Sequence, residues 1–104
     1  MELRKDYRIE QCLNDIQKYE KWGNLLQWQT LAHLFNSDEP ISALAIHNGL
    51  RYAEAKMKLD VLLPQNDTHS DEEKEKRLNQ IEIDIRLLEE MIKNDLEYRN
   101  MLIP

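Results

Sequence analysis

Four side chains in this sequence belong to the types that most often carry catalysis or bind a metal: Cys12, His33, His47 and His69. They share no helical face, and the sequence contains no HExxH, ExxH, CxxC or glycine-rich phosphate-binding motif. A metal ion needs several ligands that converge on one point. We therefore predict no metal site, no cofactor and no small-molecule ligand.

Cys12 is the only cysteine, and it lies on an apolar helical stripe with Ile9 and Ile16. A nucleophilic cysteine needs a nearby base, and no base is indicated by the sequence, so we predict that Cys12 is a small buried apolar residue. Carboxylates are abundant, and in so acidic a chain a pair of them does not indicate a catalytic site. These observations predict a protein that is not an enzyme.

The composition favours a single all-α domain over residues 1–104. The chain has two glycines, three prolines and one valine, Val61, which are too few turn and β-branched residues for an all-β domain of this length. Leucine, isoleucine, glutamate, lysine and glutamine dominate, and they favour helix. Charged residues make up 33% of the chain while 41% is hydrophobic, which indicates a folded protein rather than a disordered one.

Charge and cysteine content also bear on location and partners. With 20 acidic and 14 basic side chains the net charge is −6, which argues against general binding to nucleic acid. No apolar run approaches the roughly 18 residues that a membrane span needs. The charged N-terminus predicts no signal peptide, and a single cysteine is usual for a cytoplasmic protein.

Apolar spacing predicts three long helices, at about residues 2–35, 40–63 and 71–101. Pro40 suits the first turn of the second helix, with Ser37, Asp38 and Glu39 as capping residues. Ser70 and Glu73 form a capping box at the start of the third. Short connections make neighbouring helices antiparallel, so we expect an up-down-up antiparallel bundle, completed by dimerisation.

Two glycines fall inside predicted helices. Gly23 predicts either a kink in the first helix or the close approach of another helix over the missing side chain. Ala45, Gly49 and Ala53 recur every four residues, and this smooth track allows a neighbouring helix to pack closely. Whether Gly23 or Gly49 breaks its helix is left open by the sequence.

Gly49 also permits an alternative interpretation of the second helix. Ala45 and Gly49 match the small residue and the turn glycine of a helix-turn-helix, and residues 40–62 resemble the DNA-reading segment of bacterial winged-helix regulators. The resemblance implies a DNA-binding transcriptional regulator. Asn48 and Lys58 depart from it by occupying apolar positions, and no hairpin wing follows. The side chains implied for DNA contact are Arg51, Tyr52 and Lys56.

The leading hypothesis depends on a surplus of apolar residues. Each helix has a main apolar stripe and further apolar residues on another side, which is more than a three-helix monomer needs to bury. We therefore predict a helical protein–protein interaction module that forms a homodimer and binds another protein, as a regulatory, inhibitory or chaperone-like protein. The residues predicted for partner binding are Trp28, Phe35, Ile46, Leu50, Met57, Ile83 and Leu87.

Overall fold

The computed structural model describes residues 7–34, 40–63 and 70–103, and side chains 31–34 lie outside that description. Helix α1 spans Tyr7–Leu34, α2 spans Ala43–Leu62 and α3 spans Asp71–Tyr98; strand β1 is Ile41–Ser42 and β2 is Leu102–Ile103. The fold class is therefore all-α, as predicted. The predicted ends of the first helix, at residues 2 and 35, fall outside the described residues.

Both ends of α3 have identifiable caps. Ser70 has extended backbone angles, and its hydroxyl oxygen accepts a hydrogen bond of 3.2 Å from the Glu73 N–H, so the predicted start of this helix is confirmed. The helix ends at Tyr98 rather than at Met101. Asn100 adopts a φ of 57°, which asparagine tolerates better than most residues, and the Met101 N–H then donates to the Leu96 carbonyl at 2.8 Å.

The prediction that Pro40 begins a helix is wrong. Ile41 and Ser42 are extended instead, and they pair in parallel with Leu102 and Ile103 at the other end of the chain. The Ile41 N–H donates to the Met101 carbonyl at 2.8 Å, and the Ile41 side chain is buried. This pairing ties the start of α2 to the end of α3. The proposed caps Ser37, Asp38 and Glu39 lie outside the described residues.

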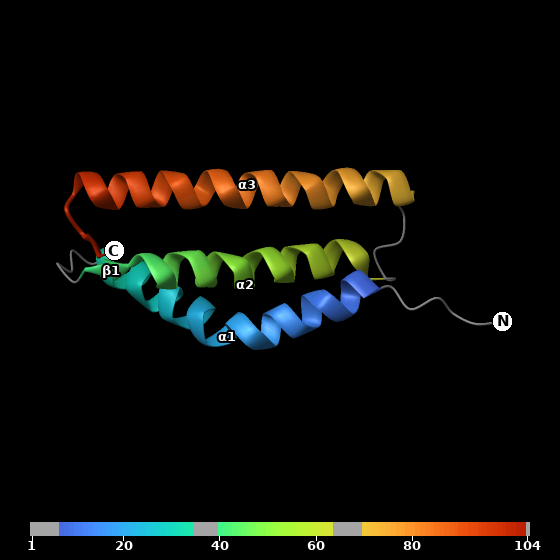
Figure 1. The fold of residues 1–104 in the computed structure, drawn as a ribbon, viewed down its shortest axis with the longest axis horizontal. Helices are drawn as coiled ribbons and strands as arrows, with labels where there is room; N and C mark the ends of the chain where they lie inside the picture. The colour runs from blue at the N-terminus through green and yellow to red at the C-terminus, as the bar shows by residue number, and fades with distance from the viewer. Residues whose placement is uncertain (1–6, 35–39, 64–69, 104) are drawn as a thin grey trace.

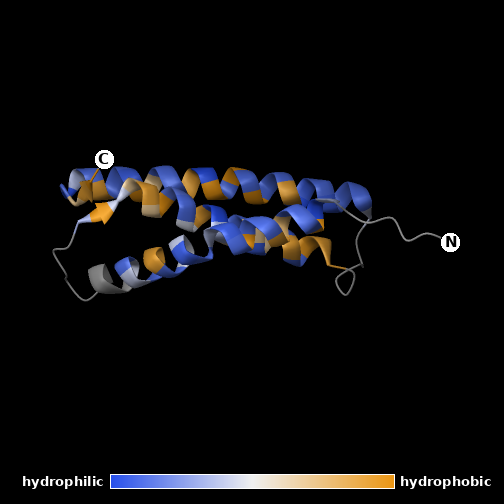
Figure 2. Cartoon of the chain, turned by 60° about the horizontal axis from the view of Figure 1, so that its bottom comes forward, coloured by the Kyte–Doolittle hydropathy of each residue, from blue (hydrophilic) through white to orange (hydrophobic). Residues whose placement is uncertain are grey.

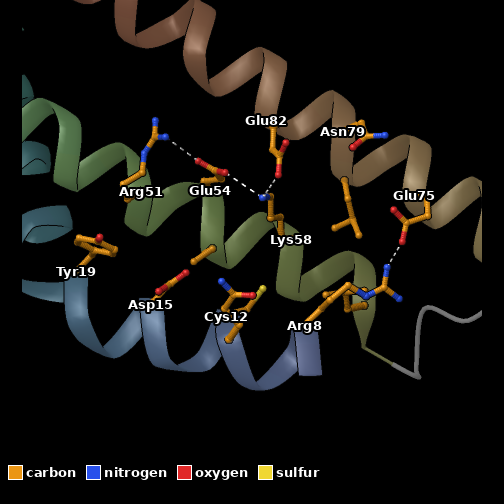
Figure 3. A pocket seen from close by; sticks show the side chains of 14 residues that line it. Arg8, Cys12, Asp15, Tyr19, Arg51, Glu54, Lys58, Glu75, Asn79 and Glu82 are labelled. Carbon is orange, nitrogen blue, oxygen red and sulfur yellow. Dashed lines mark hydrogen bonds and ion pairs between the residues drawn. The ribbon is translucent and has the colours of Figure 1, made fainter. Parts of the chain in front are cut away.

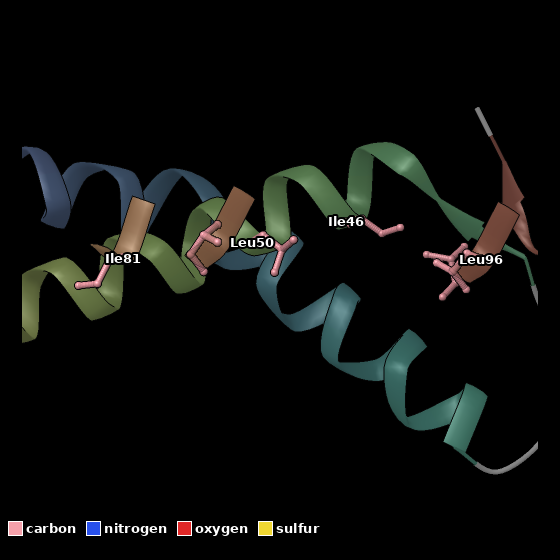
Figure 4. Close-up of a cluster of buried hydrophobic side chains, with 6 residues drawn as sticks. Ile46, Leu50, Ile81 and Leu96 are labelled. Carbon is pink, nitrogen blue, oxygen red and sulfur yellow. The ribbon is translucent and has the colours of Figure 1, made fainter. Parts of the chain in front are cut away.

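Helix α2 is the central element of the molecule, which measures 57 × 23 × 22 Å (Figure 1). It packs against both α1 and α3, whereas α1 and α3 have few direct contacts in the described part of the chain. Helix α1 crosses α2, and its C-terminal half then leaves α2, as Figures 2 and 4 both show. None of the described helices combines the length and apolarity needed to span a bilayer.

Two groups of buried side chains hold these helices together. The larger lies mainly between α2 and α3 and includes Ile46, Leu50, Ile81 and Leu96 (Figure 4). The smaller joins one buried residue from each helix: Cys12 of α1, Leu62 of α2 and Leu78 of α3. Cys12 is thus a buried apolar residue, as its position on the stripe predicts.

Neither Gly23 nor Gly49 interrupts its helix, and both mark the place where α1 and α2 cross. A Cβ added at Gly23 would overlap the Tyr52 ring, and one added at Gly49 would lie 2.7 Å from the Leu26 Cβ. Each helix thus inserts one large side chain over a glycine of the other. The predicted close approach is confirmed at both positions.

Candidate functional site

The chemically reactive residues do not come together in the described structure. Cys12 is buried at one end of the helices. His47 is exposed on α2, where its Nδ1 lies 3.1 Å from Glu89 Oε1. The His33 side chain and His69 lie outside the described residues. No three histidine, cysteine, aspartate or glutamate side chains within residues 7–34, 40–63 and 70–103 are placed to hold a metal ion.

A charged groove of about 350 Å³ lies between α1 and α3, with α2 as its floor (Figure 3). Most of the side chains that line it are charged or polar. They include Arg8, Asp15 and Tyr19 from α1, Arg51, Glu54 and Lys58 from α2, and Glu75, Asn79 and Glu82 from α3.

The cations of this groove are each paired with carboxylates. Lys58 Nζ lies 2.6 Å from Glu82 Oε1 and 3.0 Å from Glu54 Oε1, so it links α2 to α3. Arg51 Nη1 lies 3.2 Å from Glu54 Oε2. Arg8 forms an ion pair with Glu75 and joins α1 to α3 (Figure 3).

The ion pairs shift the pKa values of their members. Burial alone would lower the pKa of Lys58, but its hydrogen bonds to Glu82 and Glu54 outweigh burial and raise the pKa above its ordinary value. The same hydrogen bond from Lys58 lowers the pKa of Glu82. Each charged form is therefore stabilised by its partner, which is the behaviour of a structural ion pair rather than of a proton-transfer group held near neutral pH.

A second ionic cluster connects α2 to α3 around Glu89. Its carboxylate lies 3.1 Å from His47 Nδ1, and it accepts hydrogen bonds of 3.2 Å from both Arg51 and Lys93. Burial alone would raise the pKa of Glu89, but the contacts with Lys93 and His47 outweigh it and lower the pKa. Glu89 is thus the charged centre of the α2–α3 contact.

The outward side of α3 carries apolar residues that nothing in the described chain covers. Ile83, Leu87 and Met91 are spaced four residues apart, which places them on one side of the helix, and they are 52%, 55% and 67% exposed. We call these three residues the α3 stripe. Leu88, beside it, is 43% exposed. A contiguous apolar stripe is a more specific indication of binding than single exposed leucines are.

Comparisons of this chain with family models, curated proteins and solved structures find no significant match.

The residues predicted for partner binding fall into two groups. Trp28, Met57, Ile83 and Leu87 are exposed. Ile46 and Leu50 are buried at 0% and 5% exposure, so the prediction that they lie on a partner-binding surface is wrong. They occupy the contact between α2 and α3, and the second apolar stripe of α2 thus serves the core of one chain. Phe35 lies outside the described residues.

Sequence reasoning missed Met91, although its spacing of four from Leu87 places it on the same side of the helix as Ile83 and Leu87. Leu44, which is 55% exposed, was also missed. That same spacing rule, continued past Leu87, finds Met91. Nothing in the pattern around Leu44 distinguishes it from a core residue at the start of α2.

The helix-turn-helix interpretation is wrong, because α2 continues through Gly49 without a turn. The three side chains predicted to contact DNA make contacts within the chain instead. Arg51 is held by Glu54 and Glu89, and Tyr52 packs over Gly23. The Lys56 amine lies 5.2 Å from the centre of the Tyr52 ring. These side chains form no common reading face.

Proposed function

We propose that this chain is a non-enzymatic, helical protein–protein interaction module that works as a homodimer in the cytoplasm. Dimerisation would complete an up-down-up antiparallel bundle that one chain leaves open. A regulatory subunit, an inhibitor or a small chaperone-like protein would have this form.

The observation that carries the proposal is the exposure of the α3 stripe. Burying apolar surface contributes about 25 cal/mol per Å², so the side chains of Ile83, Leu87 and Met91 would together favour association by several kcal/mol. The opposite side of α3 already packs in the core, because Ile81 and Ile85 on that side are buried against α2. Within the residues that the structure describes, the stripe therefore has no role in the fold that would account for its apolar character.

The charged groove supports the non-enzymatic part of the proposal. A general acid or base works best with a pKa near the pH at which it acts. In the groove the pKa of Lys58 is raised and that of Glu82 is lowered, so both side chains stay charged near neutral pH. Two side chains that stay charged form a lasting ion pair, which holds α2 to α3.

A second exposed surface on α1 supports binding of another protein. Trp28 is 72% exposed and Leu25 is 39% exposed, and a spacing of three residues places them side by side. Tryptophan is among the residues that contribute most to protein interfaces. The two surfaces lie on different helices, so self-association through α3 leaves Trp28 accessible.

Sedimentation velocity over a range of micromolar concentrations tests the dimer. We expect a species of twice the 12.5 kDa chain mass that dissociates on dilution. A chain that sediments at 12.5 kDa throughout this range would contradict the homodimer.

Reconstitution with a partner purified from the native host tests the second surface. Trp28→Ala should weaken that complex about tenfold or more, as expected of an interface tryptophan. Tyr7→Ala, which removes an aromatic residue that is 79% exposed elsewhere on α1, should leave it unchanged. Equal affinity of the Trp28→Ala variant and the parent chain would remove Trp28 from the interface.

A further inference from the structure

The outer side of α3 has the same spacing in both directions from Leu87. Seven exposed positions that lie in line with Leu87 are separated by four, three, four, four, three and four residues, an order that is unchanged when it is reversed. The residue types follow the same symmetry: apolar at the centre, amides next, and a long lysine or tyrosine side chain at the ends. These positions are Lys76, Gln80, Ile83, Leu87, Met91, Asn94 and Tyr98.

We propose that a second copy of this chain packs its α3 antiparallel against this face, with the two-fold axis at Leu87. This inference rests on the proposed homodimer and specifies its surface, direction and register. Leu87 then meets Leu87 of the partner subunit, and Ile83 meets Met91 of the partner subunit. A two-fold interface requires such self-complementarity, because each contact occurs twice. A foreign helix would place no such requirement on the spacing.

The polar positions match in the same register. Gln80 faces Asn94 of the partner subunit, so two amides meet and can hydrogen-bond. Lys76 faces Tyr98 of the partner subunit, and a lysine amine near a tyrosine ring is already a contact of this chain, at Lys18 with Tyr19 and Lys56 with Tyr52. Apolar residues thus meet apolar residues at the centre, and polar residues meet polar residues toward the ends.

The charges beside the face favour the antiparallel direction. Arg77 and Asp95 lie on the same flank of α3, ten residues before and eight residues after Leu87. Antiparallel packing brings each flank against itself, so Arg77 lies near Asp95 of the partner subunit, twice in the dimer. In a parallel two-fold pair each flank would instead face the opposite flank of the partner subunit, and Arg77 would lie far along the helices from Asp95 of the partner subunit.

Arg77 and Asp95 are both available for this contact. Arg77 forms no ion pair with another described residue of its own chain. Asp95 has a long contact of 3.5 Å with Arg99, in which both side chains are more than half exposed. An exposed pair of this kind exchanges partners at little cost.

Disulfide trapping tests the register directly. In a Cys12→Ala background, Leu87→Cys should form a covalent dimer under mild oxidation, because its two copies meet at the axis. Tyr98→Cys is the matched control, since Tyr98 is 88% exposed on the same face. Its two copies would be 22 positions apart along the helices, about 33 Å at 1.5 Å per residue, which is too far for a disulfide.

Mixing two variants extends the test. Ile83→Cys chains and Met91→Cys chains should give a mixed disulfide dimer and little of either self-linked dimer.

Charge reversal tests the contact between Arg77 and Asp95 of the partner subunit. Arg77→Glu should weaken dimerisation about tenfold, and Asp95→Arg added to it should restore most of the lost affinity.

The outcomes separate this inference from the function on which it rests. A monomer at all micromolar concentrations overturns both. A dimer that links through Tyr98→Cys, or that fails to link through Leu87→Cys, overturns the antiparallel α3 register while the homodimer stands. Rapid linkage at Leu87→Cys with none at Tyr98→Cys supports the register.

Discussion

The ring of Tyr52 on α2 lies directly over Gly23 on α1, at the point where the two helices cross. The Tyr52 ring fills the space that any other residue at position 23 would need. About one helical turn away Leu26 does the same over Gly49, so each helix supplies one glycine and one large side chain. These two contacts between a glycine and a large side chain fix where the helices cross.

We predict that Gly23→Ala destabilises the protein even though alanine is the better helix former. The added methyl group overlaps the Tyr52 ring, and overpacking of this kind costs about 1–3 kcal/mol, more than the roughly 1 kcal/mol that alanine gains in a helix. Urea denaturation followed by circular dichroism measures the net loss.

Tyr52→Ala supplies the control for this experiment. With the ring removed, Gly23→Ala should become neutral or stabilising by up to about 1 kcal/mol, since only its helix propensity remains. If Gly23→Ala costs the same in both backgrounds, the ring is not what restricts position 23.

The close helix approach could be predicted from sequence because glycine inside a helical pattern has few other uses. The boundary at Pro40 could not. Its local signals, a proline after serine and acidic residues, favour a helix start, and the competing interaction comes from Met101 and Leu102 some sixty positions later. No periodicity within residues 37–63 contains that information, so a long-range backbone pairing outweighed a local preference.

We predict that Ile41→Ala destabilises the protein by about 2–4 kcal/mol, the usual cost of truncating a buried isoleucine. Ile41 is 4% exposed, belongs to the larger core cluster and pairs with Leu102 in the short β1–β2 contact. The matched variant is Ile103→Ala in β2, because Ile103 is 46% exposed and should cost less than about 1 kcal/mol. Thermal unfolding of both variants measures the difference. Equal losses would mean that position 41 is not buried.

The candidate partner surface was predictable only in part, for a geometric reason. Periodicity identifies a second apolar stripe on α2 and another on α3, but it does not tell which is covered. Ile46 and Leu50 are buried because α2 is the middle helix with neighbours on two sides. Leu87 is exposed because α3 is an outer helix with one neighbour. The order of the helices in space therefore decides which apolar stripe is buried and which is exposed.

We predict that Glu89 stabilises the folded protein at neutral pH and that this contribution is lost in acid. Its pKa is lower in the folded chain than its ordinary value of 4.5, so the folded state is favoured while the carboxylate is charged. That contribution is complete well above pH 4.5 and is lost as the pH falls below 4.5. Glu89→Gln should therefore cost about 1–2 kcal/mol at neutral pH and much less in acid.

Denaturation at a series of pH values measures this difference in the free energy of unfolding, and Glu90→Gln, at an exposed position, is the control with the same change of charge. Parallel pH profiles for Glu89→Gln and the parent chain would contradict the role of this carboxylate.

We predict that Lys58→Met destabilises the protein by about 1–2 kcal/mol, because it leaves the largely buried Glu54 carboxylate with one cation instead of two. Methionine keeps the length and apolar stem of lysine, so the loss reports the charge rather than packing. Lys56→Met is the matched control on the same helix, where the amine is exposed and touches only the Tyr52 ring among its described contacts, and it should change stability by less than about 0.5 kcal/mol. Adding Glu54→Gln to Lys58→Met should recover part of the loss, since the amide needs no counter-charge. If the double variant is less stable than Lys58→Met alone, Glu54 is stabilised chiefly by Arg51 rather than by Lys58.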